Sequence, residues 1–196
     1  MCGVQILSWC DSLTLAPMKE YKHPPKIDIR LAAQSPEHLS GRESLSNYKR
    51  LMQETQGLGG DKLISWSVLI ENRPNATGQP SAWLALRLTL TLPLLCQRCL
   101  GLVDVDIDID RSLRFVDTEA QAEQQDDASE EDLLVISAEF DLAALIEDEV
   151  LLDLPLVPRH GICPVPVKLA VADDGFDGAA EKPNAFAVLA QLKGRH

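Results

Sequence analysis

The sequence predicts an α+β protein built on an antiparallel sheet around a central hairpin, with two or three flanking helices. Two observations carry this prediction. Two alternating stretches lie on either side of a Cys-x-x-Cys pair within residues 81–110, which is typical of paired strands. Other stretches carry apolar residues at spacings of three and four, which is typical of helices that cover one face of a sheet.

The two stretches of the hairpin differ in the character of their outward faces. In the first, leucines alternate with small or polar residues: Leu84, Leu86, Leu88, Leu90 and Leu92. In the second, Val103, Val105, Ile107 and Ile109 alternate with Asp104, Asp106, Asp108 and Asp110. A helix would spread these aspartates around its whole circumference, whereas a pair of antiparallel strands places them along one solvent-exposed face. We therefore expect an apolar inner face and an anionic outer one.

Further elements are expected before and after the hairpin. Residues 27–33 predict a short strand and residues 64–70 a second one. Between them, a helix is predicted, with Ser44 as its cap and its end at Gly57. After the hairpin, residues 133–136 predict another strand.

A further helix is expected from Asp141, its predicted cap, to the proline at 155. We expect the acidic run of Glu147, Asp148 and Glu149 on this helix to point outward for the most part, as a solvated face.

Composition limits the classes of function. The hydrophobic fraction is 45% over 196 residues, and the longest apolar run is interrupted by Arg87 and Pro93, so no transmembrane segment is expected. The first residues carry no basic signal-peptide region, which predicts a cytoplasmic protein whose cysteines stay reduced. A formal charge of −12 argues against a general nucleic-acid clamp.

The chain is predicted to hold one domain, residues 18–196, preceded by an extension of residues 1–17 whose amino-acid composition differs from the rest. Met18 is a candidate start. Residues 117–132 contain eight acids and no base, and we expect a disordered acidic loop there, with mimicry of RNA as the alternative. Residues 154–166 form a proline-rich extended arm, and residues 183–196 a short helical tail for docking or for packing on the sheet.

Cys96 and Cys99 occupy the corner between the hairpin strands, and three interpretations compete for them. A thioredoxin-like redox pair needs its first cysteine at a helix N-terminus, and the residues after this pair predict a strand instead. A zinc knuckle suits a strand-to-strand turn but needs a second pair of ligands, which His160 and Cys163 offer at the same spacing. The third interpretation is that these are ordinary small residues near a turn.

Three blocks of the sequence stand out: LLCQRCLG, IEDEVLLDLPLVPRH with a following cysteine, and KPNAFAVLAQLK. Taken in this order, they resemble the YceD family, the large ribosomal RNA subunit accumulation proteins of bacteria and plastids. The resemblance covers about residues 18–196. Some members of the family carry a second cysteine pair where this chain has His160 and Cys163. The positions that match the family blocks are Cys96, Cys99, Glu147, Glu149, Leu154, Pro155, Pro158, His160, Cys163, Pro183, Asn184 and Phe186.

The resemblance implies a non-enzymatic ribosome-biogenesis factor that promotes synthesis, processing or stability of 23S ribosomal RNA. Its partner would be the pre-ribosomal large subunit or an associated protein, with neither a membrane nor a small-molecule substrate. The alternative is a zinc- or thiol-dependent enzyme that works at the Cys96 and Cys99 corner. A candidate patch for RNA or a partner is formed by Arg87, Arg98, Arg111 and Arg114, unless these are scattered solubilising charges.

Overall fold

The computed structural model describes residues 18–166, and its contacts divide the chain into two units, Met1–Gly161 and Ile162–His196. All helices and strands of the described residues lie in the first unit. The extension of residues 1–17 and the tail of residues 183–196, with Pro183, Asn184 and Phe186, lie outside the described residues. No helix in the described part is long and apolar enough to cross a membrane.

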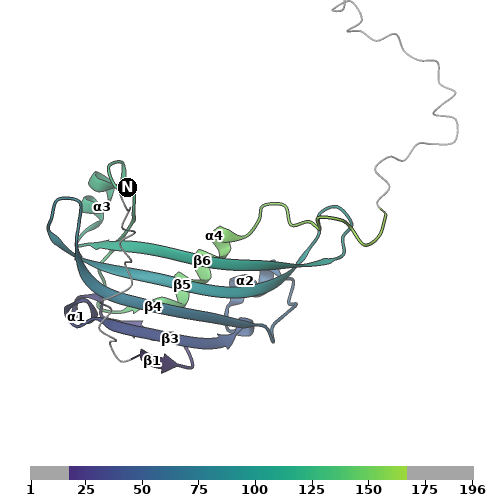
Figure 1. Ribbon diagram of the computed structural model, residues 1–196, viewed down its shortest axis with the longest axis horizontal. Coiled ribbons are helices and arrows are strands. Elements are labelled where there is room, and N and C mark those ends of the chain that lie inside the picture. The colour runs from purple at the N-terminus through teal and green to yellow at the C-terminus, as the bar shows by residue number, and fades with distance from the viewer. Residues whose placement is uncertain (1–17, 167–196) are drawn as a thin grey trace, which may run out of the picture. The chain divides into compact units, whose positions relative to one another are not determined.

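The central hairpin is the longest feature of the sheet, as the alternation predicts. Strand β5 (Pro80–Leu95) pairs antiparallel with β6 (Leu102–Val116), and β4 (Leu63–Pro74) pairs antiparallel with the other side of β5. Strand β3 (Glu37–Ser44) completes this antiparallel centre (Figure 1). The predicted α+β class and central hairpin are therefore confirmed.

The edges of the sheet correct the prediction that it is wholly antiparallel. The six strands run in the order β1-β3-β4-β5-β6-β7, and both outer strands, β1 (Met18–Tyr21) and β7 (Asp132–Val135), are parallel to their neighbours. A parallel neighbour requires a crossover, and these edge strands are only four residues long. The sequences of such short strands do not indicate whether they run parallel or antiparallel to their neighbours. Strands β2 (Lys26–Ile27) and β8 (Phe140–Asp141) form a separate antiparallel pair.

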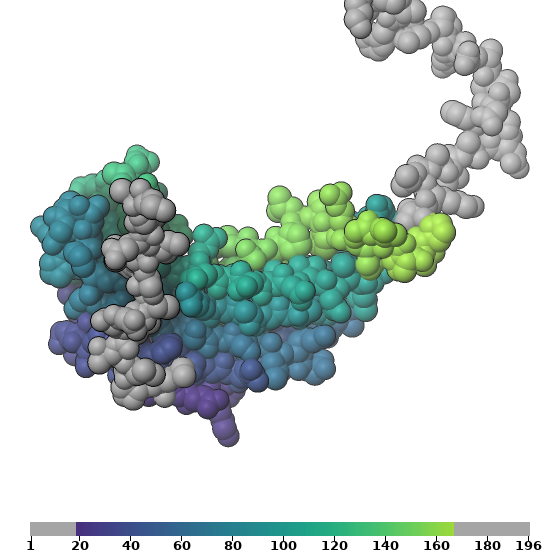
Figure 2. All heavy atoms as spheres, in the orientation of Figure 1, coloured from purple at the N-terminus to yellow at the C-terminus, as the bar shows by residue number. Residues whose placement is uncertain are grey.

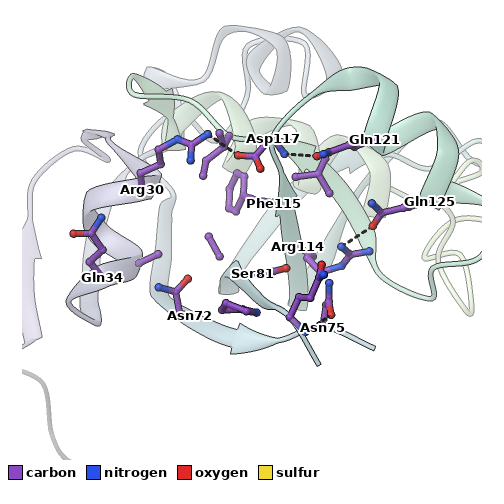
Figure 3. Close-up of a pocket in the computed structure, with 16 residues that line it drawn as sticks. Arg30, Gln34, Asn72, Asn75, Ser81, Arg114, Phe115, Asp117, Gln121 and Gln125 are labelled. Carbon is purple, nitrogen blue, oxygen red and sulfur yellow. Dashed lines mark hydrogen bonds and ion pairs between the residues drawn. The ribbon is translucent and has the colours of Figure 1, made fainter. Parts of the chain in front are cut away.

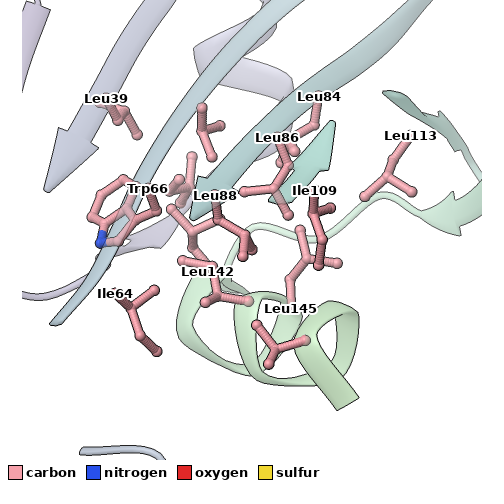
Figure 4. Close-up of a cluster of buried hydrophobic side chains, with 14 of the residues drawn as sticks. Leu39, Ile64, Trp66, Leu84, Leu86, Leu88, Ile109, Leu113, Leu142 and Leu145 are labelled. Atoms are coloured by element: carbon pink, nitrogen blue, oxygen red, sulfur yellow. The ribbon is translucent and has the colours of Figure 1, made fainter. Parts of the chain in front are cut away.

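Three helices pack on the apolar face of the sheet: α1 (Ile29–Gln34), α2 (Lys49–Glu54) and α4 (Leu142–Asp153). Figure 1 shows α4 passing behind β5 and β6, and Figure 4 shows Leu142 and Leu145 of α4 beside Leu88 and Ile109 of these strands. Burying a leucine side chain contributes roughly 1.5–3 kcal/mol. The alternating face predicted from sequence is thus the surface on which the helices are held.

Two predicted elements have other structures. Residues 29–34 form α1, capped by Asp28, where the sequence predicted a strand over 27–33. Apolar residues at 29, 32 and 33 suit one helix face, and the run is too short for its period to be decisive. Ser44 does cap a helical turn, the 3-10 helix η1 (Leu45–Asn47), but α2 begins only at Lys49.

The acidic segment is mostly helical, where the sequence predicted a disordered loop. Residues 119–126 form α3 (Glu119–Asp126), whose N-cap is Thr118 and whose first turn contains Glu119, a favourable position for an anion. The buried Arg114 donates hydrogen bonds to Gln125 and Ser129, and lies 3.8 Å from a carboxylate oxygen of Glu131. A cation outside the segment therefore fixes its fold, and a count of charges within it could not reveal this.

Candidate metal centre

The Cys-x-x-Cys corner is a tight turn between β5 and β6. The backbone N–H of Cys96 donates to the oxygen of Gly101 over 2.8 Å, and that of Leu100 to the oxygen of Cys96 over 2.9 Å. Leu100 has a φ of 58°, in the left-handed region that non-glycine residues seldom adopt. Cys96 is buried and Cys99 is half-buried. The turn thus holds both thiols on the side where the arm approaches.

The proline-rich arm is attached to this corner by polar contacts of its first residues. No helix or strand interrupts residues 154–166. The backbone N–H of Gln97 donates to the oxygen of Pro158 over 2.8 Å, and the Arg98 guanidinium donates to the oxygens of His160 and Gly161. Pro158 thus has a defined place in the site as a backbone acceptor.

His160 faces the thiols with one nitrogen and the hairpin with the other. Its Nε2 lies 2.9 Å from the oxygen of Leu102, and its Nδ1 lies 3.4 Å from Sγ of Cys99. Because a carbonyl oxygen can only accept, we assign the proton to Nε2, which leaves the Nδ1 lone pair toward the thiols. A histidine that binds a metal is commonly oriented by this second contact.

The donor atoms of Cys96, Cys99, His160 and Cys163 all lie within 4.8 Å of one another. In a tetrahedral zinc site with Zn–S bonds of about 2.3 Å, neighbouring sulfurs are about 3.8 Å apart. Three thiols and one imidazole are also a common ligand set of structural zinc. The cluster could therefore hold a metal ion, and it brings together the four residues that the matched spacing singled out.

The electrostatics of Cys96 favour a thiolate. Burial opposes ionisation, but backbone N–H groups of Cys99, His160 and Arg98, together with the His160 side chain, outweigh it and lower the pKa of Cys96 to about 5. Metals bind the thiolate form, so a group that is already ionised at neutral pH gives up no proton on binding.

The comparisons with known proteins address the same region. A family model described as "Large ribosomal RNA subunit accumulation protein YceD" matches residues 84–193, which is more than half of the chain. The chain belongs to the YceD family. A relative described by the same words, from Haemophilus influenzae, is 27% identical over 178 residues, which cover 90% of this chain and 99% of the relative. No solved structure gives a significant match.

Two positions in the YceD family blocks, Glu147 and Glu149, lie on α4 and are largely buried, which corrects the outward orientation expected for the acidic run. Glu147 accepts from the backbone N–H of Arg50 over 2.7 Å and from its Nε over 2.9 Å. Helix α2 has no side-chain cap of its own, so Glu147 supplies one from α4. Only Asp148 of the run is well exposed, and its carboxylate lies 2.5 Å from Arg50 Nη1.

Glu149 lies 3.6 Å from the Nε of Arg111 across the packed face of β6. Burial raises the pKa of Glu149, and Arg111 offsets part of that effect. Two further residues of the YceD blocks are Leu154, at the C-cap of α4, and Pro155, which follows it. Pro155 cannot continue a helix, so α4 ends where the arm begins.

The four candidate arginines lie at separate places. Arg87 points to the outer face, where it contacts Asp110 over 3.0 Å, and Arg98 is at the corner. Arg111 points to the helical face, because its partner in the register is Leu86. Arg114 is buried beneath α3.

A polar pocket of about 360 Å³ lies at the other end of the hairpin and had no signal in the sequence. Figure 3 shows that α1, the β4–β5 hairpin, the end of β6 and α3 all contribute to its lining. Its two arginines are engaged, Arg30 with Asp117 over 2.5 Å and Arg114 with Gln125 over 3.0 Å. Residues that converge from four elements far apart in the chain show no spacing pattern, so only the fold reveals them.

Replacing Glu147 by alanine should destabilise the protein by about 1–3 kcal/mol, because the α2 N-terminus loses its cap and Arg50 loses a partner. The matched change Asp148→Ala should cost about 0–1 kcal/mol, since that carboxylate is half exposed. Urea unfolding of both variants measures the difference. Equal losses in the two variants would contradict the capping role.

The buried Glu149 should make stability depend on pH in a defined direction. Because its pKa is raised in the folded state, the folded protein binds the proton more tightly than the unfolded chain does. The wild type should therefore gain stability relative to Glu149→Gln as pH falls from neutral through the folded pKa. Thermal unfolding at several pH values measures this, with Glu123→Gln as an exposed control. If the wild type instead loses stability relative to Glu149→Gln on acidification, a raised pKa of Glu149 in the folded state is excluded.

Proposed function

We propose that this chain is a non-enzymatic ribosome-biogenesis factor that promotes synthesis, processing or stability of 23S ribosomal RNA. The observation that carries the proposal is membership of the YceD family, together with the description of the Haemophilus influenzae relative as a large ribosomal RNA subunit accumulation protein. The predicted cytoplasmic location belongs to the same proposal. Its site of action would be the pre-ribosomal large subunit or a protein associated with it.

The charge distribution favours a protein partner over broad contact with RNA. Outside residues 117–132 the chain still carries 22 acids against 18 bases. Arg87, Arg111 and Arg114 lie close to Asp110, Glu149 and Glu131 respectively. Since affinity for RNA depends on cations that neutralise phosphates, arginines already facing carboxylates contribute little to it.

We further propose that the cluster of Cys96, Cys99, His160 and Cys163 holds a structural zinc ion. Four protein ligands fill the tetrahedral shell, whereas catalytic zinc keeps one position for water or substrate. An enzyme at this corner is therefore less well supported than a structural ion that attaches the arm to the hairpin. When bound, the ion would supply the bonds that join the arm to the hairpin.

Depleting the protein from cells should lower the ratio of mature large-subunit to small-subunit ribosomal RNA, because the proposed factor acts on the large subunit alone. Mapping precursor ends in the same samples separates a block in processing from a loss of stability. A plasmid copy with the native sequence should restore the ratio. An unchanged ratio would overturn the proposed function and leave the fold and the metal centre unaffected.

The full chain, purified without chelator or affinity metal, should contain about one zinc per molecule by elemental analysis. Cys96→Ser and Cys163→Ser should each remove most of the metal, because three remaining ligands hold it weakly. Cys2→Ser and Cys10→Ser are matched controls that should leave the stoichiometry unchanged. A wild-type content near zero would exclude the zinc site, whatever the outcome of the depletion experiment.

A further inference from the structure

Within the described residues, strand β6 has one edge without a neighbouring strand over most of its length. Strand β7 pairs only with Leu113–Val116, whereas β5 pairs with β6 from Leu102 to Arg114. Residues 103–112 therefore have a described neighbour strand on one side only. Both ends of this edge are closed, since the oxygen of Leu102 lies 2.9 Å from His160 Nε2 and the oxygen of Val116 accepts from the N–H of Ile136.

An open edge presents unpaired backbone N–H and C=O groups, to which another extended chain can add as a strand. Figure 1 shows β6 as the outermost long strand of the sheet. In the described part of the chain, no backbone–backbone hydrogen bond to residues 103–112 comes from outside the β5–β6 pair. Among the described residues, the groups that would accept a further strand are thus unpaired along this segment.

The side chains beside this edge define what an added strand would have to carry. Asp104, Asp106, Asp108 and Asp110 are all exposed on the outer face, which Figure 2 shows formed by the strands themselves. The opposite face carries Val103 and Val105, both partly buried. Because side chains of a strand alternate between faces, a fitting strand alternates cationic and apolar residues.

The negative charge of the aspartate row distinguishes between the molecules that could bind at this edge. A second copy of this chain paired edge to edge would bring aspartates against aspartates, which is destabilising. A nucleic acid would bring phosphates against the same row. We infer that the edge of β6 over residues 103–112 is a docking site for an extended segment of a basic protein, with lysine or arginine alternating with apolar residues.

This inference does not depend on the proposed role in ribosome biogenesis. A labelled nine-residue peptide of alternating lysine and valine is the probe, and fluorescence anisotropy with the full chain measures its affinity at about 0.15 M salt. The same peptide with N-methylated backbone nitrogens keeps every charge but cannot donate to a strand. It should bind at least about tenfold more weakly, since several main-chain hydrogen bonds are lost.

Two double variants with the same change of charge separate the edge from the rest of the surface. Asp106→Asn with Asp108→Asn should weaken the lysine peptide several-fold. Asp126→Asn with Asp127→Asn, at the exposed end of α3, should not. Thermal unfolding confirms that both variants are folded. In the wild type, bound peptide should slow hydrogen exchange at the alternate amides of residues 103–112 that do not face β5.

Several results would overturn the inference. Equal affinity of the methylated peptide, or equal weakening by both double variants, would show general attraction between opposite charges only. Outward amides that are already protected in the free protein would mean that another part of this chain or a second copy occupies the edge, and sedimentation distinguishes the two. Protection of the same amides by a ten-nucleotide single-stranded RNA would assign the edge to nucleic acid instead.

Discussion

The pairing of β5 with β6 is the interaction on which the rest of the structure depends. Its register sets Leu84, Leu86 and Leu88 on one face and the aspartates of β6 on the other. Because side chains alternate strictly along a strand, a slip of one residue would exchange the two faces. If β6 slipped, the helices would meet carboxylates and the solvent would meet Val105, Ile107 and Ile109. The same pairing places the two cysteines at its closed end.

A series of contacts leads from this hairpin corner through the arm to the helices. Pro158 and His160 attach the arm to the corner, and Pro155 ends α4 so that the arm can leave it. Farther back, Glu147 of α4 caps α2. Positions that match the YceD family blocks occur at each of these steps. In the described structure these positions contribute contacts that hold the arm and the helices in place.

Much of this could be read from the sequence where one local rule decides the outcome. The alternation of β5 and β6 and the Asp141 cap of α4 are such cases, and so is the matched spacing of the four residues that cluster at the corner. Two of the failures share a physical cause. Helix α3 depends on Arg114, and the burial of Glu147 depends on a backbone amide nearly a hundred residues away. Local composition carries no information about such partners, nor about the orientation of His160 that directs Nδ1 to the thiols.

The row of aspartates on β6 contributes little to the stability of this fold. Among the described residues only Asp110 has a cation within reach, Arg87, while Asp106 accepts a hydrogen bond from Thr91. Alternate residues on a strand are about 7 Å apart, which is within the screening length of about 8 Å at physiological salt, so the four charges repel one another. A sequence selected for stability alone would place threonine or a mixture of charges here. Arg87 offsets the repulsion at Asp110 alone, and a strand of basic residues added at the neighbouring edge would place cations against the rest of the row.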